Sequence, residues 1–157
     1  MKVLVLGGAG AVCSEATKDL SFTSNFSEIT IGEIDVKKAK ALAEELNDNR
    51  ISIVEVNVEN VEELINLMKG FDIVVNGLPF KYDEKVTEAA IAAKVNGLDV
   101  SGLQELEKHN EEAEKAGVIY VPGVGATPGV TNLLAKYAAN NLDEVYEIQI
   151  SHAAYRL

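Results

Sequence analysis

The alternation of short apolar runs with longer helical patterns constrains the fold of this 157-residue chain more than any other feature. The runs are rich in Val and Ile, as expected of strands buried on both faces of a parallel sheet. They lie at residues 3–6, 28–31, 51–56, 73–75, 98–100 and 119–121. The strand–helix–strand order predicts an α/β protein with a doubly wound parallel sheet, covered by helices on both faces in three α/β/α layers.

The segments between the runs carry apolar residues at the spacing of an amphipathic helix. Three such stripes are Val36, Ala39, Leu42, Ala43 and Leu46; Val61, Leu64, Ile65 and Met68; and Val86, Ala89, Ala90 and Ala93. Asp35 and Asn60 precede two of these helices as N-cap candidates, and Gly70 and Gly117 lie where helices should end. The helix boundaries therefore agree with the predicted order of strands.

The chain changes character after residue 124. We expect Pro128 at the first position of a helix, with an apolar stripe from Val130 to Ala138. Residues 145–157 alternate apolar and polar side chains, which predicts a half-exposed strand. We therefore predict one domain at residues 1–124, followed at residues 125–157 by the crossover helix and first strand of a truncated second domain. The exposed strand offers an edge through which two copies could form a homodimer.

The net charge of −11 restricts the partners of the chain. Nucleic acids and anionic membranes need basic patches, so we expect neither as a partner. No apolar run approaches the roughly 20 residues of a membrane-spanning helix, and Met1 leads into the first strand without a signal peptide. The single cysteine excludes an internal disulfide and fits a reducing compartment, so we predict a cytoplasmic protein.

The two histidines are poor candidates for chemistry. His109 lies in the charged stretch "QELEKHNEEAEKAG", which predicts a solvated helix surface. His152 lies near the C-terminus and would reach a site only if a following domain folded back. Because the sequence has no His/Cys cluster and no supported Ser–His–Asp arrangement, we predict no metal site and assign no catalytic residue.

A glycine-rich turn follows the first run, in the stretch "VLVLGGAGAVCSEA" at residues 3–16. In a dinucleotide-binding turn, the first glycine makes the tight turn and the second lets the backbone approach the pyrophosphate. Gly8 and Gly10 supply these two, and a reading that starts at Gly7 gives a related spacing of Gly7, Gly10 and position 13. The pyrophosphate would then lie at the helix N-terminus, against Ala11 and Val12. The strand before the turn and the helix after it predict a dinucleotide-binding Rossmann domain.

Cys13 stands where a third glycine usually lets helix and strand pack closely. Three interpretations are open. Cys13 could be a tolerated small residue, it could weaken the cofactor site, or it could act as a redox sensor, since a helix N-terminus lowers a thiol pKa.

The second feature of such a site is an acid that binds the adenosine ribose hydroxyls, about 20 residues further on. We favour Glu33, because it ends the second strand, while Asp35 is also suited to cap the next helix. A carboxylate there repels a 2′-phosphate, and the neighbouring Ile34 offers no arginine to hold one. The sequence therefore favours NAD over NADP, although Lys37 and Lys38 would weaken this preference if they left the solvated helix face.

Ligands of an open parallel sheet bind beyond the carboxyl ends of its strands. Asn57 and Val58 follow the third run and could flank the adenine. Gly77, Leu78 and Pro79 follow the fourth and could contact the ribose and pyrophosphate. The stretches at residues 99–103 and 122–132 end at the same edge, so we expect one shared site there.

Several stretches together resemble the saccharopine dehydrogenase-like family, which includes lysine-related and carboxynorspermidine dehydrogenases. They are "VLVLGGAGAVCSEA", "ITIGEID", "VVNGLP", "LDVSG" and "VPGVGATPGVTNLLA", in that order. The most specific is the glycine–proline–glycine run into a helix, from Gly125 to Leu134. The resemblance covers nearly the whole chain, but only the N-terminal part of the family's usual length.

This resemblance implies a Rossmann domain followed by a substrate domain, and NAD(P)-linked oxidation or reduction at a carbon bearing an amine. By match, the cofactor residues are Gly8, Gly10, Glu33, Leu78 and Pro79, while Asp99, Ser101, Gly125, Pro128 and Gly129 lie towards the nicotinamide and the substrate. The substrate would be a small amino acid or opine-type molecule. Without the substrate domain, we expect the chain to bind cofactor but not to turn over.

Two other functions are considered. One is a stand-alone dinucleotide-binding regulatory module without catalysis. The other is an enzyme like the short-chain reductases, whose Tyr-x-x-x-Lys pair is missing here. The fourth residue after Tyr82, Tyr120 and Tyr137 is Val86, Val124 and Asn141, respectively.

Overall fold

The computed structural model describes residues 1–101 and 104–151 and contains a parallel sheet of the predicted type. Its six strands lie in the order β3-β2-β1-β4-β5-β6, and every pairing is parallel. The strands are β1 (Lys2–Leu6), β2 (Glu28–Glu33), β3 (Ile51–Glu55), β4 (Ile73–Asn76), β5 (Asn96–Asp99) and β6 (Tyr120–Val121). Each predicted apolar run forms a strand, and the order reverses between β1 and β4, as in a Rossmann fold.

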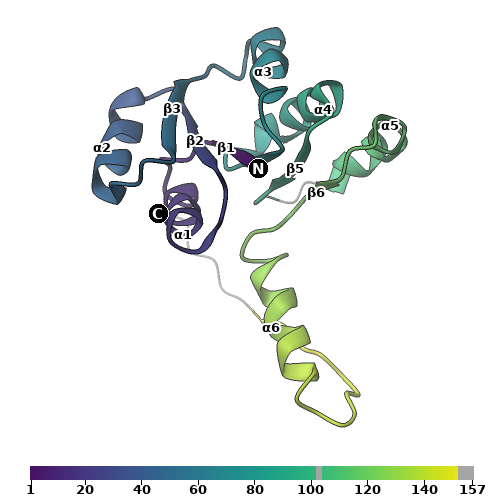
Figure 1. Ribbon diagram of the computed structural model, residues 1–157. Coiled ribbons are helices and arrows are strands. Elements are labelled where there is room, and N and C mark those ends of the chain that lie inside the picture. The colour runs from purple at the N-terminus through teal and green to yellow at the C-terminus, as the bar shows by residue number, and fades with distance from the viewer. Residues whose placement is uncertain (102–103, 152–157) are drawn as a thin grey trace.

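Helices cover both faces of this sheet, which confirms the three-layer prediction (Figure 1). They are α1 (Cys13–Thr23), α2 (Val36–Leu46), α3 (Val61–Met68), α4 (Asp83–Ala93), α5 (Asn110–Ala116) and α6 (Val130–Ala139), with short 3₁₀ helices η1 (Phe80–Tyr82) and η2 (Gln104–His109). Helices α1 and α2 pack on one face, and α3 and α4 pack on the other.

The alternation of side chains along β1 explains why its run is apolar throughout. Leu4 and Leu6 point towards α3 and α4, where they pack with Leu64. Val3 and Val5 point to the opposite face and pack with residues of α1. Successive side chains of a strand point to opposite faces of the sheet. A strand whose two faces are both covered by helices therefore has apolar residues at every position.

The structure confirms three helix boundaries that capping residues predicted, namely the starts of α2 and α3 and the end of α5. The Asp35 carboxylate accepts a hydrogen bond from the Lys37 backbone amide at 3.2 Å, at the start of α2. The Asn60 side chain accepts one from the Glu63 amide at 3.4 Å, at the start of α3. Gly117 ends α5 with a φ of 71°, in the left-handed region that glycine adopts without strain.

The C-terminal part of the chain departs from two predictions. Pro128 lies before the N-cap residue, Gly129, so helix α6 begins at Val130 and not at the proline. Residues 144–151 form no strand, and residues 152–157 lie outside the described part of the chain. Within the part of the chain that the structure describes, the alternating pattern has no neighbouring strand with which to pair, so it lacks the hydrogen bonds that make a strand. The homodimer expected through this strand loses that support.

Helix α6 extends away from the sheet (Figure 1). Its apolar stripe is exposed to solvent, although the sequence pattern is that of a packed helix. The exposed side chains are Val130, Leu133, Leu134 and Tyr137. Among residues 1–101 and 104–151, no element covers this stripe.

Candidate functional site

The glycine turn connects β1 to α1 with the tight geometry that its sequence predicts. The Gly7 amide donates to the Gly32 carbonyl at 2.8 Å, and the Gly10 amide donates to the Gly7 carbonyl at 2.8 Å. Gly7 has a φ of 67°, and a Cβ on Gly8 would lie only 2.9 Å from the Val5 carbonyl oxygen. Both positions therefore need glycine, the first for its backbone angle and the second for space.

The first turn of α1 lies directly after these glycines. Ala11 and Val12 are exposed just before and at the N-cap of the helix, as expected of residues whose backbone would hold a pyrophosphate. Thr17, a residue that sequence analysis did not single out, lies fully buried one turn further on. Its hydroxyl lies 2.9 Å from the Gly8 carbonyl oxygen and 2.8 Å from that of Cys13, so it ties the turn to the helix.

The structure accommodates Cys13 through a glycine elsewhere in the chain. Cys13 is 1% exposed and packs against the segment that follows β4. A Cβ on Gly77 would lie 2.0 Å from the Cys13 sulfur and 2.8 Å from its Cβ. The close packing that a third glycine usually permits is therefore kept. The glycine that permits it is Gly77, on the segment that Cys13 contacts, instead of residue 13 itself. Burial also raises the pKa of the Cys13 thiol, which argues against the redox-sensor interpretation.

Glu33 ends β2 beside the glycine turn, since the turn's first hydrogen bond goes to the preceding residue, Gly32. Its side chain is half-buried and accepts from the Ile34 amide at 3.1 Å, while the Ile34 side chain is exposed. Asp35 has the capping role that competes with ribose binding. Lys37 and Lys38 are exposed on α2, and Lys38 lies 3.8 Å from Asp35.

The segment after β4 lies against the glycine turn. The Gly77 amide donates to the Leu6 carbonyl at 3.0 Å, and a Cβ on Gly7 would lie 3.2 Å from the Gly77 carbonyl oxygen. Leu78 follows, held by a hydrogen bond from its amide to the Asn76 side chain at 3.2 Å, and Pro79 is exposed. The structure therefore brings together the predicted cofactor residues of β1 and β4.

The two residues predicted after β3 have different surroundings. Asn57 is exposed, and its side chain accepts from the Glu59 amide at 3.0 Å. Val58 is buried and packs in the core with Leu4 and Leu6. Its side chain therefore faces away from the edge, and only its backbone can contribute to an adenine site.

A buried polar network joins the ends of β4 and β5, and sequence analysis missed most of it. Asn76 donates to one oxygen of the fully buried Asp83 at 2.9 Å, and the hydroxyl of the exposed Ser101 donates to the other oxygen. Burial raises the pKa of Asp83, and the nearby charge of Asp99 adds to this shift. A polar residue at the end of the apolar run, Asn76, was the signal that could have revealed the network.

Asp99 fixes the loop that follows β6. Its carboxylate accepts from the Ser101 amide at 3.0 Å and from the Gly123 amide at 3.1 Å, and its side chain is fully buried. Beyond Gly123, the Gly125 amide donates to the Pro128 carbonyl at 3.1 Å, which closes the turn before Gly129. The residues expected on the substrate side are therefore held at the same edge of the sheet as the glycine turn.

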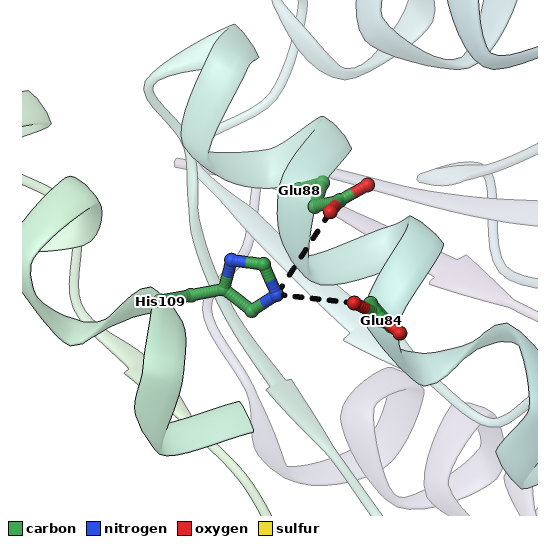
Figure 2. Close-up of side chains that lie close together, drawn as sticks. All are labelled: Glu84, Glu88 and His109. Atoms are coloured by element: carbon green, nitrogen blue, oxygen red, sulfur yellow. Dashed lines mark ion pairs between the residues drawn. The ribbon is translucent and has the colours of Figure 1, made fainter. Parts of the chain in front are cut away.

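The prediction for His109 is wrong. Its side chain is not on a solvated surface but is buried against α4, facing Glu84 and Glu88 (Figure 2). The helical pattern alone could not reveal this, because the covering residues come from another part of the chain. His152 lies outside the described residues.

No described helix is both long and apolar enough to cross a membrane.

Comparisons with known proteins agree with this geometry. Residues 3–121 match the family described as saccharopine dehydrogenase NADP binding domain. Mitochondrial alpha-aminoadipic semialdehyde synthase from Bos taurus is 32% identical over 158 residues, which cover 98% of this chain and 16% of that protein. Carboxynorspermidine synthase from Vibrio alginolyticus is 27% identical over 175 residues, which cover 96% of this chain and 42% of that protein.

The fold has a counterpart among solved structures. Apo saccharopine dehydrogenase (L-Glu forming) from Saccharomyces cerevisiae superimposes with a TM-score of 0.76 at 23% identity, covering 89% of this chain and 31% of that one. The chain thus spans less than half the length of these relatives. With the match over residues 3–121, which include the glycine turn after β1, the chain belongs to the saccharopine dehydrogenase NADP-binding domain family.

Proposed function

We propose that this chain is the dinucleotide-binding part of an NAD(P)-dependent oxidoreductase that acts on the C–N bond of an amino acid or opine-type substrate. The observation that carries the proposal is the glycine turn between β1 and α1, with Gly77 and Leu78 packed against it at the point where the strand order reverses. The named relatives are enzymes, and none supports a stand-alone regulatory module.

In such an enzyme the cofactor supplies the hydride chemistry, and the protein supplies binding and orientation. The backbone of Ala11 and Val12 would hold the pyrophosphate, while Leu78, Pro79 and Ser101 would line the path towards the nicotinamide. We assign no catalytic acid or base within this chain. We therefore propose that it binds cofactor without turnover when it is alone.

We further propose that NAD is preferred to NADP, because Glu33 is the acid that meets the adenosine ribose. The family description names NADP, so this preference is the sharpest point to test. In support, Glu33 is placed beside the turn, and Ile34 offers no positive charge to a 2′-phosphate. Lys37 and Lys38 are exposed on α2, and Lys38 forms an ion pair with Asp35.

A calorimetric titration with NADH and with NADPH tests the proposal. We expect NADH to bind about tenfold or more tightly, the size of effect that repulsion between two nearby charges gives. Glu33→Gln should reduce the ratio of the NADPH to the NADH dissociation constant. Glu55→Gln is a matched control, since Glu55 pairs with Glu33 in the sheet register and is also a carboxylate at a strand end.

Three results would contradict parts of this proposal. Tighter binding of NADPH would remove Glu33 as the ribose ligand and direct attention to Lys37 and Lys38. If Glu33→Gln and Glu55→Gln changed the preference for NADH equally, the preference would come from the negative charge of this region and not from a contact of Glu33 with the ribose. Binding of neither cofactor, in the parent and also in Cys13→Gly, would overturn the dinucleotide site itself.

The rest of the proposal concerns the longer protein. We propose that residues 1–124 form the dinucleotide domain and that residues 125–157 begin a substrate domain, with Asp99, Gly125, Pro128 and Gly129 at the junction. The exposed apolar stripe of α6 supports this, because such a stripe is usually covered in a folded protein. The single buried cysteine supports a reducing, cytoplasmic location.

A further inference from the structure

His109 is buried at the end of η2, within one of the most charged stretches of the sequence. The residue is 8% exposed, and its imidazole points towards helix α4. Its Nδ1 atom lies 3.3 Å from a carboxylate oxygen of Glu112, which is on α5. This contact holds one ring nitrogen and leaves the other, Nε2, directed at α4.

Nε2 has no hydrogen-bond partner among the residues that the structure describes. It faces two carboxylate oxygens, at 3.7 Å from Glu84 and 3.9 Å from Glu88, and Figure 2 shows it aimed between them. Both distances exceed the length of a hydrogen bond. A buried polar nitrogen without a partner is costly, so the arrangement calls for an atom between these groups.

Glu84 and Glu88 are four residues apart, so they lie on the same face of α4, one turn from each other. One ligand atom from each of Glu84, Glu88 and His109 lies within 4.8 Å of the others. A tetrahedral ion with bonds of about 2.0–2.2 Å separates its ligands by about 3.4 Å. Side-chain rotations that change these separations by up to about 1.4 Å therefore bring the two carboxylates and the imidazole onto one ion.

The surroundings fit such an ion. An imidazole with two carboxylates is a donor set that Zn²⁺ accepts, with a fourth position left for water. Glu112 on Nδ1 is the carboxylate that typically orients a metal-bound histidine. Lys108 also forms an ion pair with Glu84. This pair is on the surface, where an ion pair contributes little to stability, so a Glu84 carboxylate oxygen can bind a metal instead.

We propose that Glu84, Glu88 and His109 form a binding site for a divalent transition-metal ion, with Zn²⁺ as the ion best suited to it. The ion would fasten η2 to α4. The site lies on elements other than the glycine turn, so it is independent of the proposed cofactor function.

The test is a calorimetric titration of the chelator-treated full chain with Zn²⁺, followed by thermal unfolding with and without the ion. We expect one tight site per chain and a higher melting temperature with Zn²⁺. Glu88→Gln and His109→Asn should each weaken binding by at least about tenfold, the smallest effect typical even of residues that only support a ligand. Both should also lose the thermal shift.

Two variants serve as matched controls. Glu114→Gln removes an exposed carboxylate from α5, and His152→Asn removes the other histidine of the sequence. Neither should change the binding of Zn²⁺. Because Glu88 is about half exposed, Glu88→Gln keeps the test valid if the buried His109→Asn fails to fold.

The proposal is overturned if the parent shows no tight site with a one-to-one stoichiometry, in which case the cluster is an ion-pair cluster alone. It is also overturned if Glu88→Gln binds Zn²⁺ as the parent does, or if His152→Asn abolishes binding.

Discussion

At the scale of single residues, Asp48 and Arg50 form the most connected ion pair of the described structure. The guanidinium binds both carboxylate oxygens of Asp48, at distances of 2.6–3.1 Å. It also donates to backbone carbonyls at the end of α1 and before β2, those of Ser21, Ser24 and Phe26. The pair therefore fastens the segment before β3 to the segment before β2.

This pair predicts a pH-dependent effect of Asp48→Asn. Hydrogen bonds from Arg50 hold the pKa of Asp48 well below its usual range. A lowered pKa stabilises the fold above the unfolded-state value of about 3.9, and this contribution is lost as the pH falls. We expect Asp48→Asn to cost about 1.5–3 kcal/mol at pH 7, as for a hydrogen bond to a charged group.

Urea unfolding at pH 7, 4 and 3 provides the measurement. The difference between parent and Asp48→Asn should shrink below about pH 4, because the unfolded parent takes up a proton that its folded state does not. A difference that stays constant over this range would show that the charge of Asp48 contributes nothing.

Asp83 should behave in the opposite way. Burial raises its pKa, so the folded state keeps a proton that the unfolded state releases. The stability of the parent therefore falls as the pH rises from the unfolded value of about 3.9 through the raised folded value. An asparagine can still accept from Asn76, and its amide can donate to Ser101. We expect Asp83→Asn to gain stability relative to the parent between pH 4 and pH 7.

Chemical denaturation of the two proteins at several pH values measures this gain. Relative stabilities that do not change with pH, or that move against Asp83→Asn as the pH rises, would contradict the prediction.

At the scale of elements, the contact between α1 and the end of β4 depends on one pair of residues. A Cβ at position 77 would overlap the Cys13 side chain. We expect Gly77→Ala to cost about 1–3 kcal/mol through overpacking. In a Cys13→Gly background the two closest atoms are absent, and the nearest remaining atom is the Leu6 carbonyl oxygen at 3.2 Å. The same substitution should then cost much less.

A double-mutant cycle in urea unfolding measures this coupling. Additive effects of the two substitutions would show that Gly77 is needed for a reason other than Cys13.

The elements were predictable because each depends on a local pattern. Runs of Val and Ile predicted the strands. Asp35 and Asn60 predicted the starts of two helices, because a capping side chain binds backbone amides within the first turn of its own helix. The contact of Gly77 with Cys13 and the burial of His109 were not predictable. They join residues far apart in the chain, and no period or cap signals such a contact.

At the scale of the whole molecule, α6 contributes little to the body of the fold. It has ten residues, shorter than the roughly 12–15 at which isolated helices become stable, and its apolar stripe is exposed. We expect a chain that ends at Val124 to unfold within about 5 °C of the parent. The hydrogen bonds from Gly123 and Val124 to Asp99 are kept in this shorter chain.

Thermal unfolding followed by circular dichroism measures the effect. A chain that ends at Ala116 is the matched control, since it also loses β6 and should be clearly less stable. A loss of more than about 10 °C on truncation at Val124 would place residues 125–157 within the first domain.

The doubly wound parallel sheet was predicted from the sequence, whereas the end of the chain was not. Alternation at residues 145–150 satisfied the pattern of a strand, but a strand also needs a neighbour. Likewise, Pro128 suited the first turn of a helix, yet the Gly125–Pro128 hydrogen bond places it in the preceding turn.

The contact between Cys13 and Gly77 also restricts the order in which substitutions can accumulate along a lineage. In a chain with a side chain at position 77, a cysteine at position 13 is destabilising, so the change to Cys13 is tolerated best where glycine already stands at 77. Once Cys13 is established, a larger residue at position 77 costs stability. A search for dinucleotide-binding chains that scores the pair, instead of position 13 alone, would therefore recover sequences that a glycine motif rejects.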